Sequence, residues 1–349
     1  MDSLNKYGFN GIFEAYAAEY PALTPARVIL QEKDLYRIVT AYGEQPAFVS
    51  GKFRYEAQTV SEYPAVGDFV MVEHAGEDGN AVIQAILPRK SVFTRRAAGT
   101  ANREQVVAAN IDTVFICMSL NNDFNVRRLE RYLSVAWDSG ASPVIILTKA
   151  DLCDDLDQRL REVESVALGV EVVVTSSLSE NGTDTLKPYL KEGKTASFIG
   201  SSGVGKSTLI NRLMGSDRLA TNGLRNDDKG RHTTTHRELV LLEDGALVID
   251  TPGMRELGMW GAESGIDTTF ADIEALALVC KFKNCTHTSE PGCAIRAGIE
   301  DGSLSEERYR SYTKLSAENA YAEDSESYLA AKSKKFKEIA KYQKSIKKR

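Results

Sequence analysis

The chain has 349 residues, a formal net charge of -6 and 42% hydrophobic residues, enough apolar content to bury the cores of two or three domains. No apolar run is long enough to span a bilayer, and the first residues lack the basic-then-apolar pattern of a secretion signal, so we expect a cytoplasmic protein without a membrane partner. Five cysteines, an odd number, argue against a disulfide framework.

The N-terminal part divides into an extension and a region of short strands. Residues 1–25 mix polar and aromatic side chains, predict a short helix ending near Pro21, and suggest no chemistry. Five short alternating segments separated by glycines then follow, at 27–31, 36–40, 45–50, 68–73 and 81–86. This pattern predicts a small OB-like β-barrel over residues 26–92. An RNA-binding face on it is suggested by Lys52, Phe53, Arg54 and Tyr55, although a solvated hairpin accounts for them equally well.

Strands and helices alternate in the next region. The polar stretch from Arg95 to Asn110 suggests a linker. Continuous apolar strands are predicted at 112–119, 143–147 and 170–174, and one helix at 126–139. Such strands are typical of parallel sheets covered on both faces, so we predict an α/β domain over residues 93–262.

The second of these strands runs directly into a Thr-Lys-Ala-Asp sequence. A carboxylate at Asp151 can accept hydrogen bonds from the N1–H and 2-amino groups of guanine, which adenine lacks, and Lys149 would lie under the base. On its own the segment favours a surface turn, whereas together with a phosphate loop it favours a guanine site. The predicted guanine loop comprises Thr148, Lys149, Ala150 and Asp151, with Ser176 and Ser177 after the third strand placed to meet the guanine O6.

A phosphate-binding loop is the clearest motif of the chain. Gly200 to Thr208 fits the pattern G-x-x-x-x-G-K-[ST], between a predicted strand at 195–199 and a predicted helix at 208–214. Its glycines and backbone N–H groups would wrap a phosphate, and the following helix directs its positive end there. We predict nucleotide contacts from Gly200, Ser201, Ser202, Gly203, Val204, Gly205, Lys206, Ser207 and Thr208.

Two later segments supply what a hydrolytic switch needs. The threonine-rich run Gly230–Thr235 lies between the phosphate-loop helix and the next strand, and we predict that Thr234 completes a Mg²⁺ shell begun by Ser207. Strands at 239–243 and 246–250 pair through a turn, and the second ends in Asp-Thr-Pro-Gly. Asp250 would hold Mg²⁺, and the Gly253 N–H would bond the γ-phosphate.

The C-terminal region, residues 263–349, combines a cysteine cluster with a basic tail. The spacing C-x4-C-x-H-x5-C predicts a closed, structural Zn²⁺ site formed by Cys280, Cys285, His287 and Cys293, whereas Cys117 and Cys153 are better explained by packing. Residues 332–349 hold eight lysines, one arginine and one acid. Their apolar spacing favours a basic amphipathic helix that contacts RNA phosphates, although a solvated tail is an alternative for the last residues.

Taken together, these motifs resemble the circularly permuted GTPases that depend on the small ribosomal subunit (RsgA/YjeQ type). GTPase motifs normally begin with the phosphate loop, whereas here the guanine loop and the serine loop precede it. The resemblance implies a permuted P-loop GTPase domain, preceded by an OB-like barrel and followed by a mainly helical zinc domain. It also implies a monomer that binds GTP or GDP and the 30S subunit through its 16S rRNA, and that acts in late subunit maturation.

Two departures from the family pattern concern the site. The family usually has Asn where this chain has Thr148, so we expect weaker nucleotide affinity with specificity kept by Asp151. Met254 follows the DxxG glycine, where many GTPases place a water-orienting glutamine, so intrinsic turnover should be slow. The resemblance suggests His232 as the substitute, with catalytic roles also for Lys206 and Thr234; a loop histidine without such a role is the alternative.

Two other functional classes stay open from the sequence. An ATP-dependent P-loop enzyme is one, because the phosphate loop alone does not select the base. A nucleotide-responsive RNA-binding scaffold with incidental hydrolysis is the other.

Overall fold

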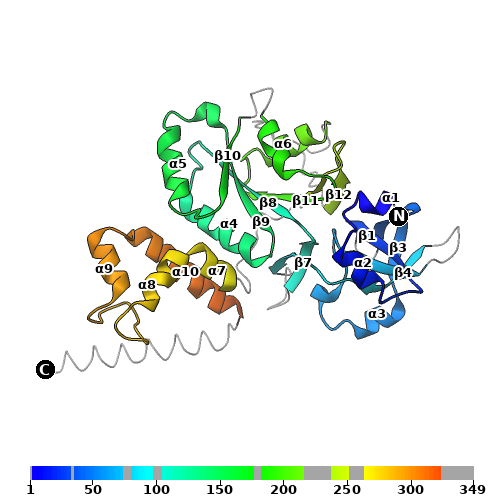
Figure 1. The fold of residues 1–349 in the computed structure, drawn as a ribbon, viewed down its shortest axis with the longest axis horizontal. Coiled ribbons are helices and arrows are strands. Elements are labelled where there is room, and N and C mark those ends of the chain that lie inside the picture. The colour runs from blue at the N-terminus through cyan, green and yellow to red at the C-terminus, as the bar shows by residue number, and fades with distance from the viewer. Residues whose placement is uncertain are drawn as a thin grey trace, which may run out of the picture. The chain divides into compact units, whose positions relative to one another are not determined.

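The structure is a computed structural model, shown in Figure 1, that describes residues 2–32, 35–73, 80–96, 104–176, 182–215, 237–250 and 263–323. The chain forms two compact units, residues 1–258 and residues 259–349. None of the described helices is both long and apolar enough to cross a membrane.

The first unit begins with two short helices and a closed barrel. Helices α1 (Asp2–Asn5) and α2 (Ile12–Ala17) precede the strands β1 (Thr24–Gln31), β2 (Tyr36–Thr40), β3 (Gly43–Val49), β4 (Phe69–Glu73) and β5 (Ala81–Ile86). The barrel closes because β1 pairs with both β2 and β4, and β5 pairs with both β3 and β4. Alternate residues such as Ala26, Val28 and Ile38 fill its interior. The predicted five-stranded barrel is therefore confirmed.

The segment 51–56 is a helix, so a hairpin is the wrong interpretation of it. Helix α3 (Gly51–Glu56) begins after Ser50, whose hydroxyl accepts a hydrogen bond from the Phe53 N–H at 3.0 Å. This N-cap satisfies one of the free N–H groups at the start of the helix. A short 3₁₀ turn, η1 (Val60–Glu62), follows.

A hairpin replaces the predicted linker. Strands β6 (Val92–Arg96) and β7 (Glu104–Ala109) pair antiparallel, with a register shift between Phe93 and Thr94. The run from Val106 to Ala109 is buried, so this segment has a packed face that a linker would lack. The packed face was not predicted from the sequence, because polar residues are frequent in this segment and its apolar side chains contact segments that are distant in the chain.

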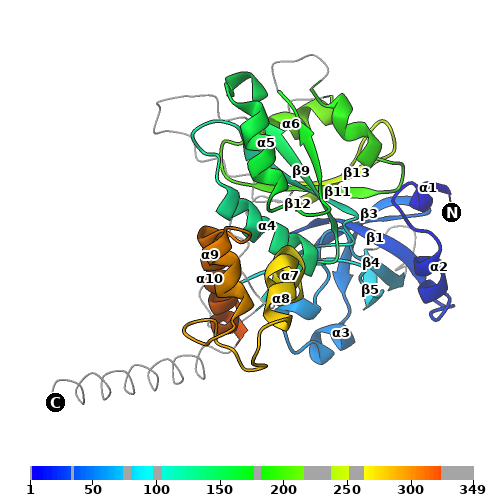
Figure 2. The same cartoon turned by 60° about the vertical axis from the view of Figure 1, so that its left-hand side comes forward.

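The α/β part contains a parallel sheet with one antiparallel strand. Its order is β10-β9-β8-β11-β13-β12, formed by β8 (Thr113–Ser119), β9 (Ser142–Thr148), β10 (Glu171–Val174), β11 (Thr195–Gly200), β12 (Arg237–Leu241) and β13 (Leu247–Asp250). Only β12 runs antiparallel to its neighbour β13 among these strands. Around the parallel strands pack α4 (Val126–Asp138), α5 (Leu156–Glu164) and α6 (Lys206–Leu213) (Figure 2). The short 3₁₀ turns η2 (Ala150–Leu152) and η3 (Asp184–Tyr189) precede α5 and β11 in the chain. The predicted α/β fold is confirmed.

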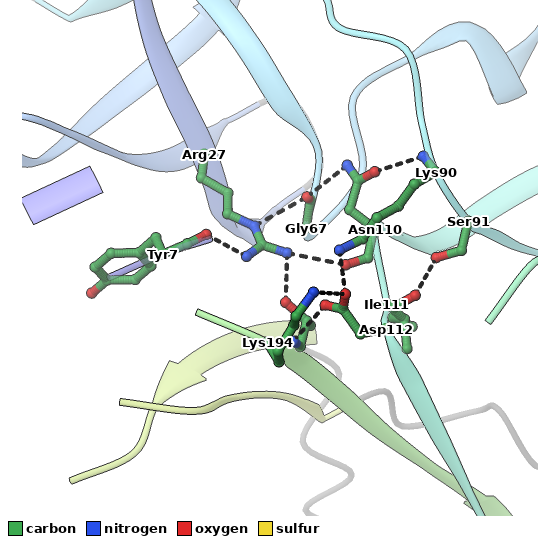
Figure 3. Close-up of polar contacts among 10 residues, drawn as sticks. Tyr7, Arg27, Gly67, Lys90, Ser91, Asn110, Ile111, Asp112 and Lys194 are labelled. Carbon is green, nitrogen blue, oxygen red and sulfur yellow. Dashed lines mark hydrogen bonds and ion pairs between the residues drawn. The ribbon is translucent and has the colours of Figure 1, made fainter. Parts of the chain in front are cut away.

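Two contacts join the barrel to the parallel sheet. Strand β1 pairs with β12, where Leu30 lies opposite Glu238 and Gln31 opposite Arg237. The second contact is the buried guanidinium of Arg27, 1% exposed, which lies over the Phe69 ring at 4.7 Å. It donates hydrogen bonds to the carbonyls of Tyr7 at 2.5 Å, Gly67 at 3.2 Å and Asn110 at 3.3 Å, and to Thr195 Oγ1 at 2.8 Å (Figure 3).

The Arg27 contacts tie four distant segments together. Burial lowers the pKa of Arg27 to about 10, while the carboxylates of Asp112 and Asp68 act in the opposite direction, so the group stays charged at neutral pH. Asp112 in turn accepts hydrogen bonds from the Thr195 N–H at 2.8 Å and from Lys90 Nζ at 2.7 Å. Thr195 begins the strand that leads into the phosphate loop, so this joint fixes the base of that strand.

The variant Arg27→Met is expected to lower the free energy of unfolding of the first unit by about 2–4 kcal/mol, because buried acceptors lose their donor. Urea denaturation followed by circular dichroism measures this. The control is Arg37→Met, which removes an exposed guanidinium from β2 and should change stability by less than about 0.5 kcal/mol. Equal losses in both variants would contradict a structural role for the Arg27 contacts.

The second unit is helical in its described part. It contains α7 (Glu263–Thr269), α8 (Ala271–Leu278), α9 (Ala294–Asp301) and α10 (Glu306–Glu323). Arg308 of α10 donates to both carboxylate oxygens of Asp272, at 2.8 and 2.7 Å, and lies over the buried Phe270 ring at 4.9 Å. This bidentate pair joins α10 to α8. The cysteine cluster lies in the connection between α8 and α9.

Candidate functional site

The predicted nucleotide segments lie along one edge of the parallel sheet. Strands β8, β9, β10, β11 and β13 run in the same direction, so their carboxyl ends meet at the same edge. Ser119 at the end of β8 pairs with Thr148, and Gly200 at the end of β11 pairs with Cys117. Ligands of open α/β sheets bind at this edge, whatever the order of the strands in the chain.

The phosphate loop has the backbone that its glycines predict. Gly203 and Gly205 have φ values of 77° and 99°, which favour glycine, and α6 begins directly after them at Lys206. Gly200 has a φ of 141°, and a Cβ there would collide with the carbonyl oxygen of Cys117. The Lys206 ammonium folds back over the loop and donates to the carbonyls of Gly200 at 2.6 Å and Ser201 at 2.5 Å.

The guanine loop contacts the phosphate loop directly. The Thr148 hydroxyl donates to the Val204 carbonyl at 2.6 Å, and Lys149 Nζ donates to the Gly203 carbonyl at 2.7 Å. Lys149 itself has a left-handed φ of 58°, which turns the chain sharply at the end of β9. The Thr148 hydroxyl therefore bridges the two loops. This contact was not predicted from the sequence, where Thr148 was only compared with the asparagine that is usual in the family.

Asp151 and Ser176 also come together. Ser176 Oγ donates a hydrogen bond to the Asp151 carboxylate, and the Ala150 N–H donates to the Thr175 carbonyl at 3.3 Å. The loops after β9 and β10 are thus adjacent. Three segments predicted separately, the guanine loop, the serine loop and the phosphate loop, form one continuous edge.

The other predicted residues divide into described and undescribed positions. Ser207 and Thr208 lie half-buried in the first turn of α6, and Ser202 is exposed in the loop. Asp250 is the last residue of β13, next to β11 in the sheet. Outside the described residues lie Ser177, His232, Thr234, Gly253, Met254 and the basic segment 332–349.

Sequence analysis missed one charged residue at this edge. Arg128 of α4 donates to Ser201 Oγ of the phosphate loop at 2.5 Å and to the Asp123 carboxylate at 2.8 and 2.9 Å. The loop between β8 and α4 is ordered by Asn121, whose side chain accepts from Ser119 Oγ at 2.8 Å and the Asp123 N–H at 3.1 Å. One sequence signal could have indicated that this loop belongs to the site: it is rich in asparagine and aspartate and follows a buried strand at the ligand-binding edge.

Cys117, in β8, has no reactive character. Cys117 is 1% exposed, and burial raises the pKa of its thiol to about 12 despite the charge of Lys206. Its thiol stays protonated, which agrees with the packing role predicted for it.

The second unit brings together Cys280, Cys285, His287 and Cys293, whose ligand atoms all lie within 4.8 Å of one another. His287 Nδ1 is 3.6 Å from Cys280 Sγ and 3.5 Å from Cys293 Sγ. In tetrahedral Zn²⁺ sites with ordinary bond lengths, nitrogen and sulfur ligands lie about 3.5 Å apart. The donor set and its spacing therefore fit one metal ion.

The backbone around the cluster supports metal binding. The Ala294 N–H points to Cys280 Sγ at 3.4 Å. Desolvation raises the pKa of Cys280, but hydrogen bonds from the N–H groups of Ala294 and Ile295 and from the thiols of Cys285 and Cys293 lower it, so that this pKa lies below its usual value. The Glu290 carboxylate accepts from the N–H groups of Thr286 at 2.9 Å and Thr288 at 3.0 Å, which fixes the loop that carries His287.

Comparison with known proteins agrees with this geometry. A family model described as RsgA GTPase matches residues 86–260. The chain belongs to the RsgA GTPase family. It is 53% identical over 322 residues, 91% of this chain and 90% of the relative, to "Small ribosomal subunit biogenesis GTPase RsgA 2" of Lactiplantibacillus plantarum. A Listeria monocytogenes relative with the same name is 47% identical over 91% of this chain and 90% of its own length.

Solved structures of similar proteins confirm the permuted fold of the family. YjeQ from Thermotoga maritima has a TM-score of 0.63 and 28% identity, covering 84% of this chain and 97% of that chain. YloQ, described as a circularly permuted GTPase, has a TM-score of 0.59 and 25% identity, covering 84% and 93%. The family resemblance inferred from the motifs is confirmed.

Proposed function

We propose that this chain hydrolyses GTP and that it acts in biogenesis of the small ribosomal subunit. The observation that carries the proposal is the identity of 53% over nine-tenths of both chains to a relative with that name. The geometry of the sheet edge supports it, because Thr148, Lys149 and Arg128 all contact the phosphate loop.

The hydrolytic step is an in-line attack of water on the γ-phosphate. The loop N–H groups and the Lys206 ammonium stabilise the charge that develops on the phosphate oxygens. Mg²⁺, held by Ser207, Asp250 and Thr234, would supply further charge stabilisation. Gly253 would bond the γ-phosphate through its N–H, and His232 would orient the water in place of the glutamine that Met254 replaces.

The guanine preference rests on Asp151. Its carboxylate, next to Ser176, would accept the N1–H and 2-amino groups of the base. The variant Asp151→Ala is expected to weaken GDP binding about 10–100-fold and to leave weak ADP binding unchanged. Titration with fluorescent GDP and ADP analogues measures both.

The control for this variant is Asp154→Ala, which removes an exposed carboxylate three residues away and should leave GDP affinity unchanged. If ADP competed as well as GDP for the unmodified protein, the guanine preference would be contradicted and the alternative of an ATP-dependent P-loop enzyme would be favoured.

The remaining regions have structural and RNA-binding roles in this proposal. The four-ligand cluster would hold one structural Zn²⁺ ion, and the basic segment 332–349 would contact 16S rRNA of the 30S subunit. The division into an extension (1–25), a barrel (26–92), a GTPase domain (93–262) and a zinc domain (263–349) is part of the proposal, as are the monomeric state and a cytoplasmic location.

The proposal is tested by measuring phosphate release from GTP with and without 30S subunits. The subunit is expected to raise the rate by at least about tenfold, because it completes a site that lacks the usual glutamine. An equimolar amount of 50S subunits is the control and should leave the rate unchanged. A protein that bound 30S subunits without any change in rate would instead be the RNA-binding scaffold.

A further inference from the structure

A cavity lies in the first unit, away from the nucleotide edge. It has a volume of about 410 Å³ and is formed by the barrel, the segment 54–64 and strand β7. Its polar and aromatic lining includes Gln31, Tyr36, Arg54, Tyr63 and Gln105. None of these residues belongs to the guanine, serine or phosphate loop. The volume falls in the range of about 300–1,000 Å³ that is common for small-molecule sites.

One side chain of the lining has an unused acceptor. The Gln31 side-chain oxygen is buried and has no hydrogen-bond partner in the part of the chain that the structure describes. Buried oxygens are usually paired, so this one marks a place where an N–H donor would be bound. Gln31 lies opposite Tyr36 on β2 and Arg237 on β12, and directly opposed residues share one face of the sheet.

The charge around the cavity is positive. Arg54 lines it directly, and Arg95 donates from Nε and Nη2 to Gln105 Oε1, at 3.2 and 3.1 Å. Arg237 lies opposite Gln31 in the pairing of β1 with β12, and burial, followed by the charge of Arg95, lowers the pKa of Arg237 to about 10. Within the described ranges, none of these three arginines pairs with a carboxylate, and none of the lining residues is acidic. An anion would therefore be attracted there.

The aromatic wall is held in place before any ligand binds. Arg89 binds both oxygens of the buried Asp68, at 2.8 and 2.7 Å, and donates to the carbonyls of Ser61 at 3.1 Å and Tyr63 at 3.0 Å. The Tyr63 ring meets Phe53 edge to face, with the ring centroids 5.9 Å apart. The position of Tyr63 is thus fixed by a buried ion pair, which reduces the entropy that a ligand would have to overcome.

We propose that this cavity binds a single nucleotide unit, consisting of a base and its phosphate, taken from a free mononucleotide or from an unpaired position of an RNA strand. The base packs against Tyr63 and donates an N–H to Gln31, while the phosphate binds Arg54 and the neighbouring guanidinium groups. Aromatic stacking combined with arginine contacts is how proteins bind unpaired nucleotides.

The experiment uses the full chain saturated with GDP and Mg²⁺, so that the guanine site is filled. Calorimetric titrations with cytidine 5′-monophosphate and with a 5′-phosphorylated pentacytidylate compare the two sources. Arg54→Gln and Gln31→Leu are each expected to weaken binding about tenfold, because each removes one direct contact. Lys52→Gln is the matched control, since it removes an ammonium that is 79% exposed from the same helix, and it should change affinity less than twofold.

The possible results distinguish binding of a free mononucleotide, binding of an RNA strand and the absence of binding. Saturable, Arg54-dependent binding of the mononucleotide supports a free ligand, whereas Arg54-dependent binding of the pentanucleotide alone supports an RNA strand. The proposal is overturned if neither probe shows saturable binding, or if Arg54→Gln and Lys52→Gln weaken binding equally. Because the guanine site stays filled, this result does not depend on whether the chain hydrolyses GTP.

Discussion

Replacement of Lys206 by alanine is expected to lower the rate of GTP hydrolysis about 10²–10³-fold, the usual cost of removing one preorganised group that stabilises transition-state charge. The Lys206 ammonium lies within 2.6 Å of the Gly200 carbonyl and 2.5 Å of the Ser201 carbonyl, at the base of the loop that would hold the phosphates. Two other positively charged side chains contact the described loop, Arg128, whose guanidinium is bound to Asp123 and Ser201, and Lys149, which donates to the Gly203 carbonyl.

The measurement is phosphate release at saturating GTP and Mg²⁺, with and without 30S subunits. Lys191→Ala is the matched control, because it removes the same type of side chain at an exposed position outside the phosphate loop, in the segment that leads into β11. Its rate should stay within twofold of the unmodified protein. A Lys206→Ala protein with an undiminished rate would show that hydrolysis takes place elsewhere.

Removal of the cluster ligand Cys293 is expected to unfold the second unit. Cys293 Sγ lies 3.5 Å from His287 Nδ1 and precedes the first residue of α9, so the metal would hold that helix to the end of α8. Structural Zn²⁺ contributes on the order of 10 kcal/mol to the folding of small domains, more than a unit with few buried residues can replace. Cys293→Ser should therefore lose its zinc, and limited proteolysis should cut within residues 263–323.

The control and the second readout distinguish this effect from general damage. Cys153→Ser removes a half-buried thiol outside the cluster and should leave the metal content at one ion per chain. The intrinsic GTPase rate of Cys293→Ser should change little, because the phosphate loop belongs to the other unit. Metal-free unmodified protein with an intact, protease-resistant second unit would contradict a structural role for the metal.

Local sequence signals predicted much of the nucleotide edge. The glycines of the phosphate loop, the Thr-Lys-Ala-Asp turn and the apolar strands before them each have a short-range pattern, and the structure places these described segments at one edge. The spacing of the cysteines and the histidine likewise predicted a cluster that the structure assembles. Such motifs can be recognised in a sequence because the residues that define their backbone conformation lie within a few positions of one another.

Contacts between distant segments were not predicted. The β6–β7 hairpin was expected to be a linker, since its apolar residues show no clear period until their partners are known. Arg27 and Arg128 carry no motif, although one joins four segments and the other reaches the phosphate loop. The cavity beside the barrel is also a tertiary feature, because Gln31, Arg54 and Gln105 come from elements far apart in the chain.

Local patterns in the sequence were enough to predict the individual strands of the barrel and of the parallel sheet, the glycine-rich phosphate loop, and the grouping of three cysteines with His287, because each pattern lies within a short stretch of the chain. Only the tertiary structure decided that β1 pairs with β12, that Arg27 holds the strand leading to the phosphate loop, and that a positively charged cavity lies beside the barrel. The physical reason is that buried hydrogen bonds and charges are satisfied by whichever groups folding brings near, and their separation along the chain leaves no local pattern.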